Sequence, residues 1–190
     1  MQNVLIISGH PNLKSSRANR VILETLAASD LNAEIRYLDK LYASGAIDVA
    51  SEQKRMEDAD VIVFQFPLYW YAAPAILKQW MEDVYTFGFA FGPEGSKLKG
   101  KKFLASTTVG SGEEKYAPSE SKSSCKSIET FLRPLTELAK FSEMKALDPI
   151  YSFKMAYITG VHTDDDNHAM IQRAKAHAEK VITAIKNQAS

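Results

Sequence analysis

The sequence contains one cysteine, Cys125, and this scarcity excludes both an internal disulfide framework and a metal site built only from cysteine ligands. No run approaches about 18 consecutive apolar residues, so a membrane-spanning helix is not expected. Met1 is followed directly by a strand-like apolar run, without the charged region and long apolar stretch of a secretory leader. We therefore expect a cytoplasmic protein.

An excess of charge of either sign is also missing, because 23 lysine and arginine residues balance 23 aspartate and glutamate residues. A balanced chain has no global attraction for nucleic acid, and we expect no nucleic-acid partner. The patterns G-x-G-x-x-G and G-x-x-x-x-G-K-[ST] are absent as well. Their absence argues against a nicotinamide-binding Rossmann motif and against a P-loop.

What the sequence does contain is an alternation of apolar strands and amphipathic helices, and its 190 residues fit one domain, 1–190. Strands are predicted at 3–8, 33–38, 61–66, 101–109 and 144–152. Helices are predicted from 16 to about 28, at 48–58 and 74–85, through Pro134, and after Thr163. Parallel strands need long crossovers and buried strands need both faces covered. The pattern therefore predicts an α/β three-layer sandwich with a five-stranded parallel sheet.

One strand leads directly into a cluster of aromatic residues. The strand 61–66 ends at Pro67, which removes a backbone donor, and the loop that follows consists of Leu68, Tyr69, Trp70 and Tyr71. Ligands of open α/β sheets bind beyond the carboxyl ends of the strands. Adjacent aromatic side chains at that place predict a flat wall for a planar heteroaromatic ligand, although they could equally belong to the core.

The connection after the first strand carries polar residues suited to an anion. His10 follows the strand, and Ser15, Ser16, Arg17 and Asn19 stand at the start of the next helix. Hydroxyl groups, free backbone N–H groups and the positive end of a helix together bind phosphate, and histidine or arginine adds charge. The alternative is that the serines only cap the helix.

Strands 1, 3 and 4 are neighbours in the flavodoxin-like order 2-1-3-4-5, so the loops after them meet at one crevice. The third of these loops begins with Thr107, Thr108, Val109 and Gly110. A phosphate site, an aromatic wall and this turn together predict a flavin mononucleotide (FMN) site.

The sequence resembles the flavodoxin-like NAD(P)H:quinone oxidoreductases of the DT-diaphorase type. The resemblance is strongest to the short bacterial members, which include ancillary subunits of glutathione-gated potassium efflux systems. Residues 66–80 match the family pattern Pro-[LM]-x-Trp-[FY]-x-x-Pro-x-x-[LM]-Lys-x-Trp. Also similar are Gly9-His10-Pro11, Ile47-Asp48, Glu52-Gln53 and Arg133-Pro134-Leu135.

The resemblance implies a homodimer with two sites at its interface. It places the flavin phosphate on the first loop and the isoalloxazine ring on the loops 68–71 and 107–110, and it implies a roof of aromatic residues from segment 87–91 of the partner chain. The implied substrate slot contains Trp70, Tyr71, Phe89 and Phe91. An exposed cluster of phenylalanines in 87–91 would also favour dimerisation.

Two departures from the family bear on the chemistry. Val109 stands where many members have glycine, and Lys122 stands where larger members have the histidine of a proton relay. Tyr116 matches the relay tyrosine at the flavin edge, so we predict that it is catalytic, acting alone or through water or Lys122. The alternative is that Tyr116 only packs against its loop. The chain lacks the C-terminal extension of the larger members, which leaves FAD as an alternative to FMN.

The function implied is a two-electron, ping-pong NAD(P)H:quinone oxidoreductase, in which NAD(P)H delivers hydride to the flavin and a quinone or similar aromatic acceptor then takes it. The alternatives are a flavin-binding regulatory subunit of a membrane potassium efflux system and a flavodoxin-like electron carrier. We predict no metal, because an acidic helix start explains the spacing of His162, Asp164, Asp166 and His168. His177 lies on a predicted helix without obvious partners.

Overall fold

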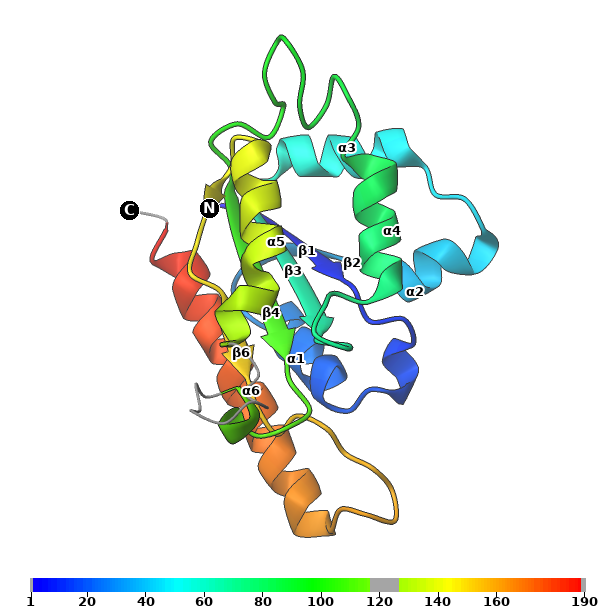
Figure 1. Cartoon of the computed structure of the whole chain (residues 1–190), viewed down its shortest axis with the longest axis vertical. Coiled ribbons are helices and arrows are strands. Elements are labelled where there is room, and N and C mark those ends of the chain that lie inside the picture. The colour runs from blue at the N-terminus through cyan, green and yellow to red at the C-terminus, as the bar shows by residue number, and fades with distance from the viewer. Residues whose placement is uncertain (1, 117–126, 189–190) are drawn as a thin grey trace, which may run out of the picture.

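The computed structural model describes residues 2–116 and 127–188. Its centre is a parallel sheet with the strand order β2-β1-β3-β4-β5, in which β6 pairs with the carboxyl half of β4 (Figure 1). The strands are β1 (Asn3–Ser8), β2 (Asn32–Tyr37), β3 (Val61–Pro67), β4 (Lys102–Thr108), β5 (Lys145–Ala146) and β6 (Ile150–Ser152). The predicted α/β class and the order 2-1-3-4-5 are confirmed.

Helices cover both faces of the sheet (Figure 1). One face carries α1 (Ala18–Ala27) and α6 (Asp164–Lys186), and the other carries α3 (Val49–Asp58), α4 (Ala75–Val84) and α5 (Ile128–Phe141). The short elements are α2 (Leu38–Leu41) and the 3-10 turns η1 (Leu13–Ser15), η2 (Tyr42–Ser44) and η3 (Glu113–Lys115). The helix α2 was not predicted, because one turn is too short to show a helical period.

Alternate apolar side chains of β1 pack into two separate cores, one on each face of the sheet. Val4 and Ile6 pack with the residues of α1 and α6, whereas Leu5 and Ile7 pack with those of α3, α4 and α5. Successive side chains of a strand point to opposite faces, so a strand covered on both faces is apolar throughout. The central strand β3 is buried at every position, and β2 lies at the sheet edge as its charged residues predicted.

The predicted fifth strand, 144–152, is wrong as one continuous element. β5 pairs with Lys102 and Phe103, and β6 pairs with Ser106 to Thr108, so two short strands share the fifth position beside β4. Between them lies Pro149, which has no backbone N–H to give to a ladder. The edge is therefore interrupted where the proline stands.

Two predicted helix starts are confirmed in detail. The Asp48 side chain accepts a hydrogen bond from the Ser51 backbone N–H, 3.1 Å away, at the start of α3. Thr163 and Asp166 form a reciprocal capping box at the start of α6. The acidic residues of 164–166 thus stabilise a helix terminus.

Glu52, which belongs to the family resemblance, has a structural role here. Its side chain is buried, one oxygen accepts from Arg36 at 2.6 Å, and the other accepts from the Trp80 indole N–H at 3.2 Å. A buried carboxylate is tolerated where such donors satisfy it. Glu52 therefore joins β2 to α3 and α4 and does not contribute to the ligand cavity described below.

The two ends of the sheet carry different connections. The long segment between α4 and β4 lies at the amino ends of the strands, at the top of Figure 1, whereas the aromatic loop 68–71 and the connection before α6 lie beyond the carboxyl ends, at the lower end of the sheet. Within the described ranges, no helix combines the length and apolar character needed to cross a membrane. Lys122 and Cys125 lie outside the described residues.

Candidate active site

A cavity of about 340 Å³ opens at the carboxyl ends of the strands. The three predicted loops all reach it. The predicted residues that line the cavity are His10, Ser15, Ser16, Arg17, Asn19, Pro67, Leu68, Tyr69, Thr108 and Gly110. The structure therefore places together most of the residues that the sequence analysis selected, although they come from distant parts of the chain.

The amino-terminal end of α1 forms the polar end of this cavity. Ser16 Oγ accepts a hydrogen bond from the Asn19 backbone N–H, 3.2 Å away, while Ser15 Oγ donates to the Asn12 carbonyl oxygen at 2.8 Å. The backbone N–H groups of Arg17 and Ala18 donate to no group in the described part of the chain. Free N–H groups and the helix dipole favour an anion here, so Ser16 both caps the helix and lines an anion site.

His10 is buried beside this end and is held in one orientation. Its Nδ1 accepts from the Asn12 backbone N–H at 3.1 Å, and its Nε2 lies 3.3 Å from the Tyr69 hydroxyl. Burial lowers the pKa of His10, although Asp39 opposes that shift. A neutral ring that accepts at Nδ1 carries its proton on Nε2, so His10 presents a donor on the cavity side.

The aromatic loop is a tight turn with unusual backbone geometry. Tyr69 and Ala72 exchange two backbone hydrogen bonds of 3.0 Å, and the two residues between them have positive φ angles, 48° at Trp70 and 65° at Tyr71. Such angles are rare outside glycine and asparagine. The turn places Tyr69 in the cavity wall and leaves the Trp70 side chain 94% exposed at the tip.

The loop after β4 contributes less than predicted. Thr107 is buried and its hydroxyl donates to the Phe66 carbonyl oxygen at 2.9 Å, and the Val109 side chain lies in the core. Thr108 and Gly110 line the cavity. A Cβ atom at Gly110 would lie 3.3 Å from Ala156, so the absence of a side chain keeps this edge of the cavity open.

Tyr116 and Tyr71 lie outside the cavity lining and in contact with each other. The Tyr116 ring centroid is 6.3 Å from that of Tyr71, 6.1 Å from that of Phe131 and 5.5 Å from that of Phe153. Tyr71 also packs on Phe131, with centroids 4.9 Å apart. An aromatic cluster thus borders the exposed turn, and Tyr116 is part of it.

The predicted roof residues lie elsewhere in this chain. Phe89 is buried in the core of its own chain, at the amino end of the sheet, so the expectation that it would be exposed without a partner is wrong. Phe87 and Phe91 are 69% and 37% exposed. They belong to the connection at the top of Figure 1, at the opposite end of the sheet from Tyr69.

Three lining residues were not predicted: Met155, Ala156 and Tyr157. They follow β6, whose carboxyl end lies beside that of β4, so extending the strand-end rule to a fourth loop would have found them. The Arg17 guanidinium lies over the Tyr157 ring, 3.8 Å from its centroid, and donates to the Asn167 amide oxygen at 2.8 Å. These contacts hold the arginine at the polar end of the cavity.

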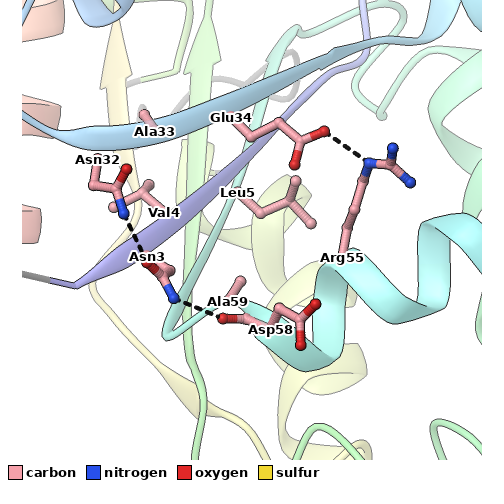
Figure 2. Close-up of a pocket in the computed structure, with 9 residues that line it drawn as sticks. All are labelled: Asn3, Val4, Leu5, Asn32, Ala33, Glu34, Arg55, Asp58 and Ala59. Carbon is pink, nitrogen blue, oxygen red and sulfur yellow. Dashed lines mark hydrogen bonds and ion pairs between the residues drawn. The ribbon is translucent and has the colours of Figure 1, made fainter.

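A second hollow, of about 260 Å³, lies at the amino ends of β1 and β2 beside the end of α3 (Figure 2). Figure 2 shows that its polar groups pair with one another: Arg55 Nε lies 2.7 Å from Glu34, and Asn3 bonds to Asn32 and to the Asp58 carbonyl oxygen. None of the predicted site residues lines it. Its satisfied polar lining argues against a ligand site there.

The cavity at the carboxyl ends fits the predicted flavin. Its polar end offers the Ser16 hydroxyl, two free backbone N–H groups and Arg17 to a phosphate, and its walls of Leu68, Tyr69 and Pro67 are flat and largely apolar. This combination of an anion site with an aromatic wall suits a phosphorylated heteroaromatic cofactor.

Comparison with known proteins identifies the same flavodoxin-like fold. The chain belongs to the family with a flavodoxin-like fold, which matches residues 2–182. It is 37% identical over 172 residues to the glutathione-regulated potassium-efflux system ancillary protein KefF of Salmonella typhimurium, spanning 90% of this chain and 93% of that protein.

Solved structures of similar proteins have the same fold. The general stress protein 14 of Treponema denticola, in complex with FMN, has a TM-score of 0.81 and 29% identity, covering 97% of this chain and 99% of that chain. An NADPH-quinone reductase from P. pentosaceus has a TM-score of 0.70 and 25% identity, covering 94% of this chain and 98% of that chain.

Proposed function

We propose that this protein is a flavin-dependent NAD(P)H:quinone oxidoreductase that uses FMN as its cofactor. The observation that carries the proposal is the cavity itself, in which residues from three predicted loops form an anion site and an aromatic wall. A structural neighbour with a TM-score of 0.81 is a complex with FMN, and another is an NADPH-quinone reductase. FMN is preferred to FAD on this ground.

The side chains around the cavity have distinct tasks in this proposal. Ser16, Arg17 and the first turn of α1 bind the phosphate, while Tyr69, Leu68 and Gly110 position the ring system and exclude water from it. A bound flavin supplies the capacity to accept hydride from NAD(P)H and to pass it to the acceptor. The exposed Trp70 and the adjacent Tyr71 provide an aromatic surface for the acceptor.

Tyr116 is the proposed catalytic donor. Its hydroxyl would stabilise negative charge that develops at the cofactor during hydride uptake. Its contact with Tyr71 places it beside the aromatic turn.

A homodimer completes the proposed site. Phe87, Phe91 and Phe141 form an exposed cluster with ring centroids 5.8 and 5.6 Å apart, and such a cluster is costly to leave in water. The cluster of one chain would roof the cavity of its partner. Sedimentation of the flavin-loaded protein should show a dimer, and a fully active monomer would refute the dimer.

The direct test is steady-state oxidation of NADH and of NADPH with a benzoquinone acceptor, with and without added FMN. The expected result is oxidation that requires both the acceptor and bound FMN. Oxidation at the rate of free FMN in solution would contradict the proposed activity. We also propose a cytoplasmic location, with which the absence of a membrane-spanning helix among the described residues is consistent.

A second candidate function is that of an ancillary subunit of a potassium-efflux system. It is favoured by the identity of 37% to a protein of that name over 90% of this chain. In that case the protein would bind a membrane-embedded efflux protein and change its ion flux. Co-purification with that partner and altered potassium efflux in its presence would support this function beside the reductase activity.

A further inference from the structure

His177 begins a line of buried polar side chains that ends at the cavity. Its Nε2 lies 2.8 Å from Ser106 Oγ on β4, and Ser106 Oγ donates to Gln65 Oε1 on β3 at 2.6 Å. Gln65 Nε2 donates to Asn19 Oδ1 at 3.0 Å, and Asn19 Nδ2 donates to Thr108 Oγ1 at 3.0 Å. All five residues are buried, so the expectation that His177 has no partners is wrong.

The hydrogen bonds of this line run in one direction. A serine hydroxyl has a single hydrogen, and that of Ser106 goes to Gln65. The contact between Ser106 and His177 must therefore be one in which the ring Nε2–H donates. The other ring nitrogen, Nδ1, then accepts from Ser152 Oγ, 2.9 Å away. Burial lowers the pKa of His177 to about 4, so the ring is neutral and holds this single tautomer at pH 7.

This direction determines what the cavity presents to a ligand. Thr108 Oγ1 already accepts from Asn19, and Ser16 Oγ accepts from the Asn19 backbone N–H at 3.2 Å. Each hydroxyl therefore keeps its own hydrogen, and both residues line the cavity. Both hydroxyls are free to donate to acceptor atoms of a ligand.

With the opposite tautomer the line would reverse. Ser106 would donate to His177, both amide groups of the line would turn over, and the Asn19 carbonyl oxygen would face Thr108. The Thr108 hydrogen would then be used within the protein, and Asn19 would compete for that of Ser16. The buried amides transmit the direction because each must be satisfied at both ends.

We propose that His177 is a positioning residue which, through Ser106, Gln65 and Asn19, orients the Thr108 and Ser16 hydroxyls as donors and thereby gives the site its preference for a phosphorylated flavin. This inference rests on the proposed function for the identity of the ligand. The direction of the hydrogen bonds does not depend on the ligand, and it can be tested without one.

The first experiment determines which ring nitrogen of His177 carries the proton. Nitrogen-15 spectra of the histidine-labelled protein at pH 7 should show His177 protonated at Nε2 and bare at Nδ1. A ring protonated at Nδ1 would overturn the proposal whether or not the protein binds flavin. A wild-type protein with the expected tautomer that binds no flavin would instead refute the proposed function.

The second arm compares the dissociation constants of FMN and riboflavin, measured by quenching of flavin fluorescence. His177→Leu should weaken FMN binding about 10-fold and riboflavin binding less than about 3-fold, since a phosphate depends most on oriented donors. His177→Gln restores a donor at the same place and should recover FMN binding. Ser106→Ala interrupts the line without altering the helix and should reproduce the effect of His177→Leu.

Val181→Ala is the matched control, because Val181 is fully buried on the same helix and takes no part in the line. It should leave the ratio of the two dissociation constants unchanged. If FMN and riboflavin weaken equally in His177→Leu and Ser106→Ala, or if neither weakens, His177 does not position these donors and the proposal is wrong.

Discussion

The two serines of the first loop differ in what they can give to a ligand. The Ser15 hydrogen is used by the Asn12 carbonyl oxygen, whereas Ser16 accepts from Asn19 and retains its hydrogen. A hydrogen bond to a charged group contributes about 1.5–3 kcal/mol. We therefore predict that Ser16→Ala weakens FMN binding about 10- to 100-fold and that Ser15→Ala weakens it less than about 3-fold.

The measurement is the FMN dissociation constant by fluorescence titration, and Ser15→Ala serves as the control for loss of a hydroxyl in the same loop. Equal effects of the two substitutions would show that the hydrogen-bond pattern of the loop does not govern phosphate binding. Unchanged binding in both variants would place the phosphate elsewhere.

The Tyr116 hydroxyl can be removed without removing the packing of its ring on Tyr71, Phe131 and Phe153. Tyr116→Phe should slow reduction of the bound flavin by NAD(P)H about 5- to 50-fold, equivalent to roughly 1–2.3 kcal/mol, with flavin affinity retained. Stopped-flow absorbance measures this rate directly. A variant that is reduced as fast as the wild type would leave Tyr116 with a packing role alone.

At the scale of elements, the turn at 69–72 combines backbone strain with exposure. Trp70 and Tyr71 have φ angles of 48° and 65°, and an ordinary side chain loses about 1–2 kcal/mol in that region. Strain of this kind is retained where it serves a site. The turn holds the Trp70 indole in water, which is costly for stability; in the proposed function this indole is available to an aromatic acceptor.

Trp70→Asn tests this trade-off, because asparagine adopts positive φ readily and has little aromatic surface. The free energy of unfolding should rise by about 0.5–1 kcal/mol, while kcat/KM for the quinone falls about tenfold. The control is Lys154→Asn, which relieves a φ of 56° at an exposed position whose side chain does not line the cavity. It should raise stability and leave kcat/KM unchanged. A Trp70→Asn variant with full activity would remove Trp70 from acceptor binding.

The elements that sequence could predict are those with a long, regular pattern. The strands β1 to β4 and the major helices carry clear periods, and the rule that ligands bind at carboxyl ends of strands then located the cavity. The rule missed Met155 to Tyr157 because it was applied only to the loops after strands 1, 3 and 4, although the predicted fifth strand ends at 152, as β6 does. The rule also selected Thr107 and Val109, whose side chains do not line the cavity. The direction of each side chain depends on strand pairing and packing that a loop sequence does not show.

The buried line from His177 lay beyond sequence reasoning for a different reason. Ser106 and His177 are 71 positions apart, and Gln65 and Asn19 are 46 apart. Contacts over such distances arise from the whole fold, and a histidine on an apolar helix face has no local signal of its partners.

At the scale of the whole molecule, His177 makes stability depend on pH. Its pKa falls from about 6.5 in the unfolded chain to about 4 in the folded protein, so the unfolded state binds more protons between these values. The stability that the neutral His177 contributes is fully present above about pH 6.5. It is lost as the pH falls toward 4, which lowers the free energy of unfolding by roughly 3 kcal/mol. His10, whose pKa is also lowered, contributes in the same direction.

Urea unfolding at pH 7.5 and pH 4.5 measures this loss. His177→Gln should reduce the difference between the two pH values by about 2–3 kcal/mol relative to the wild type. His10 is unchanged in that comparison and serves as the internal reference. An identical pH dependence in the two proteins would mean that His177 is not buried as a neutral ring.

In the proposed function, one cavity holds a flavin that reacts with both a nicotinamide and a quinone. The most direct measurement is an anaerobic visible spectrum of the protein after incubation with FMN and removal of free flavin. We predict flavin absorption that travels with the protein, bleaches on addition of NADH or NADPH, and returns on addition of a quinone. A spectrum without flavin bands, or bands that NADH and NADPH both leave unchanged, would contradict the account.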